Sequence, residues 1–158
     1  MHLRIIKSED NQAIKEIIQT TLKEFGNDIP GTAFFDPQLD TLAEFYNSQP
    51  KKARYWVIED NNKVLGGGGL APFAQPGVTE LQKLYFTPET RGHGLGTKLI
   101  HLIEKEAKKM HYNQIYIETF KNQSSAVHLY EKFGYTELTA PLQGSEHSAC
   151  DMWFIKKI

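Results

Sequence analysis

This chain of 158 residues has few features typical of membrane, secreted or nucleic-acid-binding proteins. It contains one cysteine, so an internal disulfide is impossible and a reducing, cytoplasmic environment is expected. No apolar run approaches the roughly 20 residues of a membrane span, and the segment Met1 to Lys7 has no apolar signal core. The formal net charge of −1 offers no basic surface to nucleic acid. We therefore expect one globular domain over residues 1–158, with neither a membrane nor a nucleic acid as partner.

The most informative segment runs from Glu80 to Thr97. Its first half predicts a strand, which ends in the apolar run Leu84, Tyr85 and Phe86. After Pro88 comes a glycine-rich turn made of Arg91, Gly92, His93, Gly94, Leu95, Gly96 and Thr97. Apolar residues then recur at helical spacing. The segment is therefore predicted to be a strand, a turn and a helix.

A turn of this kind is suited to binding an anion. The first turn of a helix leaves backbone N–H groups unpaired and carries the positive end of the helix dipole. Glycines without a Cβ let a ligand approach the backbone closely, and Arg91 adds a positive charge. A phosphate or pyrophosphate is the expected guest, although a plain glycine-rich connection would have the same composition.

Two common phosphate-binding motifs fit this turn poorly. Lys98 does not follow a glycine at the spacing of a P-loop. A dinucleotide fingerprint would accept Gly92 and Gly94, but Thr97 stands in place of its third glycine. Glu118 has the position of a ribose-binding acid, yet the surrounding sequence does not repeat the strand–helix–strand rhythm of a dinucleotide domain. A dinucleotide-dependent oxidoreductase is therefore a remote alternative.

A third motif matches better. The turn fits Arg/Gln-x-x-Gly-x-Gly/Ala, the pyrophosphate signature of the GNAT superfamily of acyl-CoA N-acyltransferases. The segment from Asn122 to Tyr135, which contains Leu129-Tyr130-Glu131-Lys132, is similar to a second signature of that family. Together the two motifs make the chain resemble a GNAT N-acetyltransferase over most of its length.

The resemblance implies an α+β fold, with a mixed, largely antiparallel sheet of six to seven strands flanked by about four helices. It implies acetyl-CoA as cosubstrate and a small-molecule or peptide amine as partner, and it leaves a homodimer open. The cofactor would be held by the turn from Arg91 to Thr97, by the strand end from Leu84 to Phe86, and by Asn122 and Ser125.

For the chemistry, the resemblance points to two residues. Tyr130 has the position of the tyrosine that meets the thioester sulfur, and Glu80 that of a catalytic base. Glu118 and His147 are weaker candidates for the base, and His147 is expected at the surface. Loop residues Phe34 and Phe35 are candidates for the acceptor pocket, whereas Phe25 and Tyr46 are expected to pack the helices on the sheet.

Three expectations concern residues outside these motifs. Cys150 is expected to be a small buried thiol. No metal site is expected, because the remaining histidines lack metal-ligand spacing. Gly66 to Gly69 lie within a predicted strand and indicate a bulge or a close approach of backbone, with no single explanation from the sequence. A non-catalytic acyl-CoA-binding or sensing protein on the same fold stays open as an alternative to an enzyme.

Overall fold

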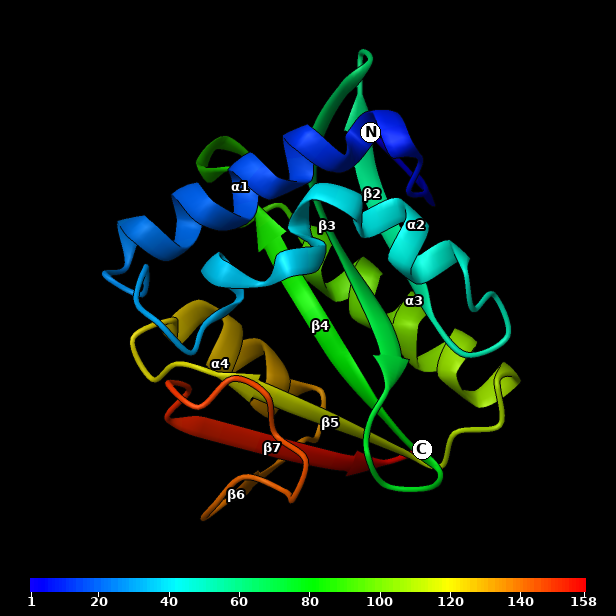
Figure 1. Ribbon diagram of the computed structural model, residues 1–158, viewed down its shortest axis with the longest axis vertical. Helices are drawn as coiled ribbons and strands as arrows, with labels where there is room; N and C mark the ends of the chain where they lie inside the picture. Colours follow the sequence, from blue (N-terminus) through cyan, green and yellow to red (C-terminus); the bar gives the residue numbers. More distant parts are fainter.

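The computed structural model describes residues 1–158 and shows one seven-stranded sheet between helices (Figure 1). The strands are β1 (His2–Ile5), β2 (Arg54–Asp60), β3 (Lys63–Pro72), β4 (Val78–Phe86), β5 (Gln114–Thr119), β6 (Thr136–Leu138) and β7 (Met152–Lys157). The α-helices are α1 (Asn11–Glu24), α2 (Leu42–Asn47), α3 (Leu95–Lys109) and α4 (Ser124–Lys132). The order across the sheet is β1-β2-β3-β4-β5-β7-β6, and only β4 and β5 are parallel neighbours. This confirms the predicted mixed, largely antiparallel architecture.

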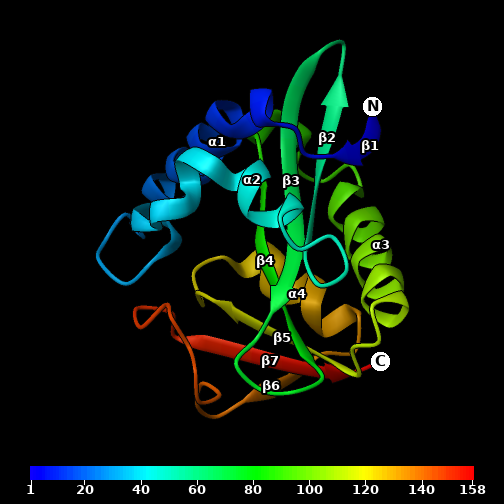
Figure 2. The same cartoon turned by 45° about the vertical axis from the view of Figure 1, so that its right-hand side comes forward.

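Helices cover both faces of the sheet. Helices α1 and α2 lie on one face, and α3 and α4 lie on the other (Figure 2). Successive side chains of a strand point to opposite faces, so Tyr55 and Val57 pack beneath α1 and α2 while Trp56 packs toward α3. The fold thus contains two large apolar cores, one on each side of the sheet.

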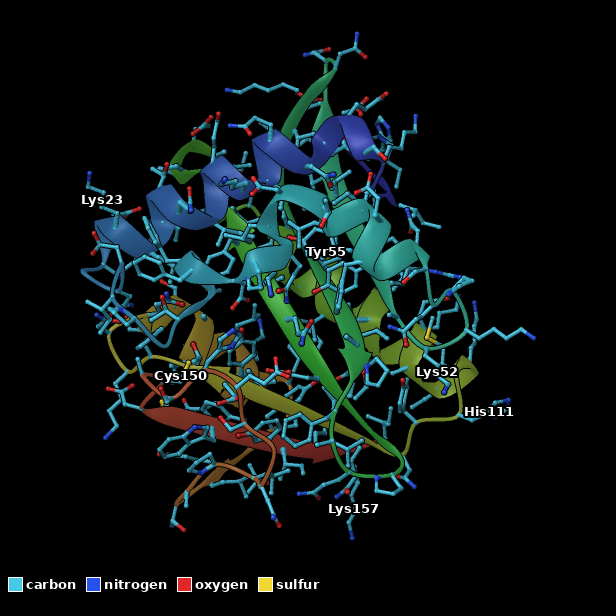
Figure 3. All side chains as sticks on the ribbon, viewed as in Figure 1. Lys23, Lys52, Tyr55, His111, Cys150 and Lys157 are labelled. Carbon is cyan, nitrogen blue, oxygen red and sulfur yellow. The ribbon has the colours of Figure 1, made fainter.

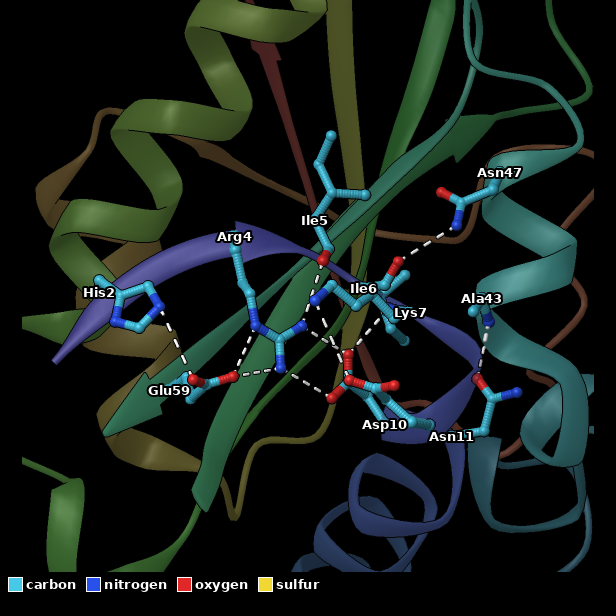
Figure 4. Close-up of polar contacts among 11 residues, drawn as sticks. His2, Arg4, Ile5, Ile6, Lys7, Asp10, Asn11, Ala43, Asn47 and Glu59 are labelled. Carbon is cyan, nitrogen blue, oxygen red and sulfur yellow. Dashed lines mark hydrogen bonds and ion pairs between the residues drawn. The ribbon is translucent and has the colours of Figure 1, made fainter. Parts of the chain in front are cut away.

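A polar cluster fixes the start of α1 against the sheet edge (Figure 4). The Arg4 guanidinium donates to both carboxylate oxygens of Asp10, at 2.7 and 2.9 Å, and also contacts Glu59 on β2. The Lys7 amide donates to Asp10 as well. Asp10 therefore anchors the chain through a cross-strand network and not by capping the first turn of α1 with its side chain.

The glycines of β3 lie opposite an irregularity in β4. Gly67 pairs with Tyr85 and Gly69 pairs with Gln82, so two residues of β4 oppose Gly68 alone, which is a β-bulge. Lys83 within the bulge has φ of 52°, a left-handed backbone that is rare for residues other than glycine. The Tyr55 hydroxyl donates to the Lys83 carbonyl at 2.8 Å. Figure 3 shows Tyr55 at the centre of the sheet beneath α2.

The glycine run makes this arrangement possible. A Cβ on Gly67 or Gly69 would lie within 2.7 Å of the Tyr55 ring and within 2.6 Å of a β2 carbonyl oxygen. A Cβ on Gly68 would meet the Leu84 side chain at 2.8 Å. Both expectations for the glycines, a bulge and a close approach, are confirmed.

Just before the bulge, β4 separates from β5. The parallel ladder contains only the pairs Val78–Gln114, Thr79–Ile115 and Glu80–Tyr116. From Leu81 onward β4 diverges from β5 (Figure 1), which leaves the β4 backbone from Leu84 to Phe86 without a strand partner on that side. The two strands form a V whose vertex is next to Glu80.

Candidate active site

A cavity opens on the α1–α2 face where β4 and β5 separate. Its wall combines residues of β4, β5, α4, the loop between α1 and α2, and the loop between β6 and β7. Its polar and ionisable members are Glu80, Gln82, Lys83, Tyr85, Glu118, Thr119, Gln123, Tyr130, His147 and Cys150. Its volume of about 40 Å³ admits a reacting head group or a few waters. The structure therefore gathers Glu80, Tyr130, Glu118 and His147, four residues singled out from the sequence, around one small space.

Two carboxyl groups and an imidazole meet in this cavity. One ligand atom from each of Glu80, Glu118 and His147 lies within 4.8 Å of the other two. The three residues form the one grouping of potential metal ligands in the chain, and sequence reasoning, which expected no metal, did not foresee it. Gln82 donates to Glu80, and Ser145 donates to Oε2 of Glu118.

The surroundings disfavour negative charge on both carboxyl groups. Burial, together with the nearby Glu118, raises the pKa of Glu80 to about 7, although Gln82, His147 and Lys83 partly oppose the shift. Burial also raises the pKa of Glu118 above its ordinary value, against the hydrogen bond from Ser145 and the charge of His147. A carboxyl group with a pKa near neutrality can accept and release a proton in the physiological range.

Asp36, in the loop between α1 and α2, connects two residues of the cavity wall, Lys83 on β4 and His147 in the loop between β6 and β7. It accepts hydrogen bonds from Lys83 at 2.8 Å and from His147 Nε2 at 2.9 and 3.0 Å. Burial alone would raise the pKa of Asp36, but His147 and Lys83 hold it below the ordinary value. Burial likewise opposes charge on His147, yet the hydrogen bond to Asp36 outweighs it and raises the pKa of the imidazole.

The expected surface position of His147 is wrong. Its side chain is 16% exposed, because it hydrogen-bonds to Asp36 and lies in the cavity wall. No sequence pattern connects these two residues, which are 111 positions apart.

Tyr130 lines the cavity from helix α4. It is 4% exposed, and its ring packs between Tyr135 and Phe154. Its hydroxyl makes no hydrogen bond within the chain and is free to meet a ligand in the cavity. Burial raises the pKa of the phenol well above its usual value, so Tyr130 carries its proton at neutral pH.

Cys150 is a buried thiol, as expected. It lines the same cavity, at the end of the β6–β7 loop, and is labelled in Figure 3. Burial raises its pKa to about 12, with further contributions from Glu118 and Glu80. It is therefore a protonated thiol at neutral pH and poorly suited to act as a nucleophile.

The glycine-rich turn begins α3 with an open backbone. Gly92 and Gly94 have φ of 80° and 74°, and Gly94 is the residue that precedes the first helical turn. A Cβ at either position would meet nothing within 4 Å, so the space outside the turn is free for a ligand. His93 between them is exposed, while Leu95 is buried in a small core and Gly96 and Thr97 are half-buried.

Arg91 points away from that open space. Its guanidinium pairs with both carboxylate oxygens of Glu24 at 2.8 and 2.9 Å, and its Nε donates to the Phe86 carbonyl. It also lies over the Phe25 ring. The side chain therefore ties the turn to the end of α1, and an anion would be met chiefly by the backbone N–H groups. Direct contact between Arg91 and the cofactor stays a prediction.

The other residues expected at the site lie around its edge. Asn122 donates to the Phe25 carbonyl and exchanges hydrogen bonds with Asn27, which fastens the loop before α4 to the end of α1. Ser125 is exposed in the first turn of α4. Phe34 packs partly against the core and Phe35 is 58% exposed, whereas the residue of their segment in the cavity wall is Ala33.

The packing roles expected for Phe25 and Tyr46 need one addition. Tyr46 is fully buried in the core beneath α1 and α2, as expected, but its hydroxyl also donates to Gln82 beside Glu80. Phe25 is half-buried at the end of α1 under the Arg91 guanidinium. Both residues therefore support the site from behind its wall.

Several residues in or next to the cavity were not predicted from the sequence, among them Lys83, Asp36 and Gln123. Lys83 lies inside the predicted strand, where its burial could not be anticipated, and Asp36 lies in a loop. Gln123, which precedes α4, has an Nε2 group that is buried without a hydrogen-bond partner. The one usable signal was the position of Gln123 next to the Asn122 signature residue.

The chain matches a known family of enzymes along most of its length. The sequence profile described as "Acetyltransferase (GNAT) family" matches residues 13–135. The uncharacterized N-acetyltransferase YjgM of Escherichia coli K12 is 35% identical over 159 aligned residues, which cover 99% of this chain and 94% of that protein. An uncharacterized N-acetyltransferase of Schizosaccharomyces pombe, C1271.07c, is 28% identical over 80% of this chain and 77% of that protein.

Solved structures agree on the fold. A GNAT-family acetyltransferase from Staphylococcus aureus Mu50 superposes with a TM-score of 0.86 at 19% identity, covering 99% of this chain and 98% of the other. The PaiA N-acetyltransferase of Thermoplasma acidophilum, solved in complex with coenzyme A, superposes with a TM-score of 0.77 at 19% identity over the same shares of the two chains.

The fold and the sequence similarities define an acyltransferase that uses acetyl-CoA as cosubstrate. The chain belongs to the GNAT family of acetyltransferases. None of its helices is both long enough and apolar enough to cross a bilayer.

Proposed function

We propose that residues 1–158 form one catalytic domain that transfers the acetyl group of acetyl-CoA directly to a primary amine. The observation that carries this proposal is that Glu80 and Tyr130 line the same small cavity, next to the unpaired backbone of β4. Glu80, which can accept a proton, and Tyr130, which can donate one, thus face one space where an amine and a thioester can meet.

The cofactor's place follows from the free backbone groups. The unpaired backbone from Leu84 to Phe86 can bind the pantetheine arm as an added strand would. The open turn around Gly92 and Gly94 can bind the pyrophosphate through backbone N–H groups at the start of α3. The thioester then reaches the cavity through the V between β4 and β5.

The reaction begins with an acceptor that is mostly an ammonium ion, since an alkyl amine titrates near 10. Glu80, with a pKa of about 7, takes one proton from it. The amine nitrogen attacks the thioester carbonyl carbon, a C–N bond forms, and the C–S bond breaks. Tyr130 hydrogen-bonds to the leaving thiolate and supplies its proton, and the second proton that the nitrogen loses on becoming an amide passes through water to the Tyr130 phenolate. Free CoA and the acetylated amine then leave, and Glu80 releases its proton to solvent.

A purified protein should release free CoA thiol from acetyl-CoA only when an amine is added. Thiol release across a panel of alkylamines, polyamines, amino acids and lysine peptides tests the proposal, and the background rate without amine is the control. Tight CoA binding with no thiol release above background for any amine would favour the alternative of a non-catalytic acyl-CoA sensor.

A further inference from the structure

The cavity that would bind the acceptor amine contains a second carboxyl group, that of Glu118, besides the proposed base Glu80. Glu80 is the last β4 residue paired with β5, and its partner is Tyr116. Glu118 lies two residues further along β5, on the same face as Tyr116, because side chains alternate along a strand. The two carboxyl groups therefore flank the vertex of the V from either side.

Glu118 is held with one oxygen unused. Its Oε2 accepts from Ser145, while its Oε1 is buried without any hydrogen-bond partner. A buried acceptor left unpaired is costly, and such groups are usually satisfied by a ligand, an ion or a water molecule. Glu118 thus faces the cavity with a free acceptor in the same space as Glu80 and His147.

The spacing suits one small hydrogen-bonded guest. Three atoms that lie within 4.8 Å of one another can all be reached from a central point at no more than about 2.8 Å, which is 4.8 Å divided by √3. This is the length of a hydrogen bond from a charged N–H group to a carboxylate. An ammonium group at that point contacts both carboxylates, with the imidazole of His147 beside them.

The charges of the wall define what else the guest can carry. Lys83 and His147 are the basic side chains of the cavity, and both are paired with Asp36. Counted together with their partner Asp36, which itself does not line the cavity, and with every group ionised, the acids Asp36, Glu80 and Glu118 exceed these two cations by one negative charge. An ammonium neutralises that charge, whereas a carboxylate next to the amine would have no free cation to meet.

We propose that Glu118 is an acceptor-binding residue that seats the ammonium together with Glu80, and that the acceptors are primary amines without a carboxylate on the amine-bearing carbon. This inference rests on the proposed amine acetylation and names its substrate class. Glu118 contributes the unpaired acceptor Oε1, which remains available while Glu80 receives the proton. α-Amino acids are excluded by like-charge repulsion in the seat, which opposes binding strongly in a partly buried site.

Three amines with the same butyl tail test the class. Pentylamine has hydrogen, 2-aminohexane has a methyl group and norleucine has a carboxylate at the position in question, so the second amine controls for bulk. We expect kcat/KM for 2-aminohexane to exceed that for norleucine by about tenfold or more. Equal use of norleucine and 2-aminohexane would overturn the proposal.

Glu118→Gln tests the residue. It keeps the shape of the side chain and removes its charge, so the KM for pentylamine should rise by about tenfold or more while the KM for acetyl-CoA stays unchanged. The preference for 2-aminohexane over norleucine should also shrink. Glu137→Gln, which removes an exposed carboxylate on β6, is the matched control and should behave like the wild type.

A measurement of amine binding tests the role of Glu118 independently of the proposed acetyl transfer. Calorimetric titration of pentylamine and norleucine into the protein–CoA complex compares the two guests without any turnover. If the wild type acetylates amines but Glu118→Gln leaves both the pentylamine KM and the selectivity unchanged, the seat is wrong and the proposed function stands. If pentylamine binds through Glu118 but no amine is acetylated, the seat stands and the proposed function fails.

Discussion

The ionised form of Glu80 is needed for activity but lowers the stability of the folded protein. Glu80→Gln should therefore raise stability and lower activity. The pKa of this carboxyl group is raised from 4.5 to about 7, chiefly by burial and also by Glu118. A shift of this size corresponds to roughly 3 kcal/mol against the charged form, at about 1.4 kcal/mol for each pKa unit. Between about pH 4.5 and 7 the folded protein binds more protons at this site than the unfolded chain, so stability falls as the pH rises through that window.

Glu80→Gln removes this cost. At pH 8 the variant should be more stable than the wild type by up to about 3 kcal/mol, and at pH 4.5 the difference should vanish. Urea unfolding at a series of pH values, followed by tryptophan fluorescence, measures the difference directly. A variant that is equally destabilised at pH 5 and pH 8 would show that Glu80 is ionised in the folded state at both values and that the reasoning from burial is wrong.

The same variant should lose activity. Loss of a general base typically lowers turnover by about 10²–10⁴-fold. In the wild type, kcat/KM should fall on the acid side of about pH 7, because Glu80 must be ionised to accept a proton. The Glu80→Gln variant should lack that acid limb. A variant that keeps wild-type turnover and the same limb would remove Glu80 from the mechanism, and His147 would be the next base to test.

Three further changes test other parts of the structure. Tyr130→Phe keeps the packed ring and deletes the hydroxyl, so single-turnover acetyl transfer should slow by about 10²-fold with unchanged acetyl-CoA affinity; an unchanged rate would make Tyr130 structural. Gly94→Asp places a negative charge on the open turn and should lower the affinity for CoA by at least about tenfold in calorimetry. The control is Gly134→Asp, at a glycine with a similar positive φ of 83° and equally open space, and it should leave the affinity for CoA unchanged. Asp10→Asn should lower the free energy of unfolding in urea by about 2 kcal/mol at pH 7, because Arg4 and the Lys7 amide outweigh burial and lower the pKa of Asp10. This loss of stability should shrink as the pH falls below about 4. The control Asp40→Asn, at an exposed carboxylate, should change stability little.

Local patterns predicted the elements of this fold well. The strand–turn–helix unit from Glu80 onward depends on residues adjacent in sequence, namely the apolar run before Pro88 and the glycines before α3. Helix α1 likewise ends at Glu24, and Gly26 two residues later has a φ of 71°, which suits a residue without a side chain. The family resemblance then supplied the mixed, largely antiparallel sheet, which no local pattern contains, but not the order of its strands.

The walls of the cavity were harder to predict, because they depend on contacts between distant residues. Asp36 meets Lys83 and His147 from two other parts of the chain, and each looks like an ordinary surface residue in its own segment. Only the assembled site shows that they neutralise one another. The prediction of a surface position for His147 failed for that reason. The role of Phe34 and Phe35 in acceptor binding stays a prediction, while their neighbour Ala33, a small residue without a sequence signal, lines the cavity.

The glycine run from Gly66 to Gly69 combines a local sequence pattern with contacts between distant residues. Its four glycines mark a close approach, but the sequence does not reveal what approaches. In the structure the Tyr55 ring lies over Gly67 and Gly69, and its hydroxyl holds the carbonyl of Lys83 at the β4 bulge. The bulge shifts the register of β4 against β3, and β4 separates from β5 beyond Glu80. Glycines that look like a defect in β3 therefore support the bulge next to the cavity, and a side chain added at Gly67 would disturb the site through Tyr55 without touching a ligand.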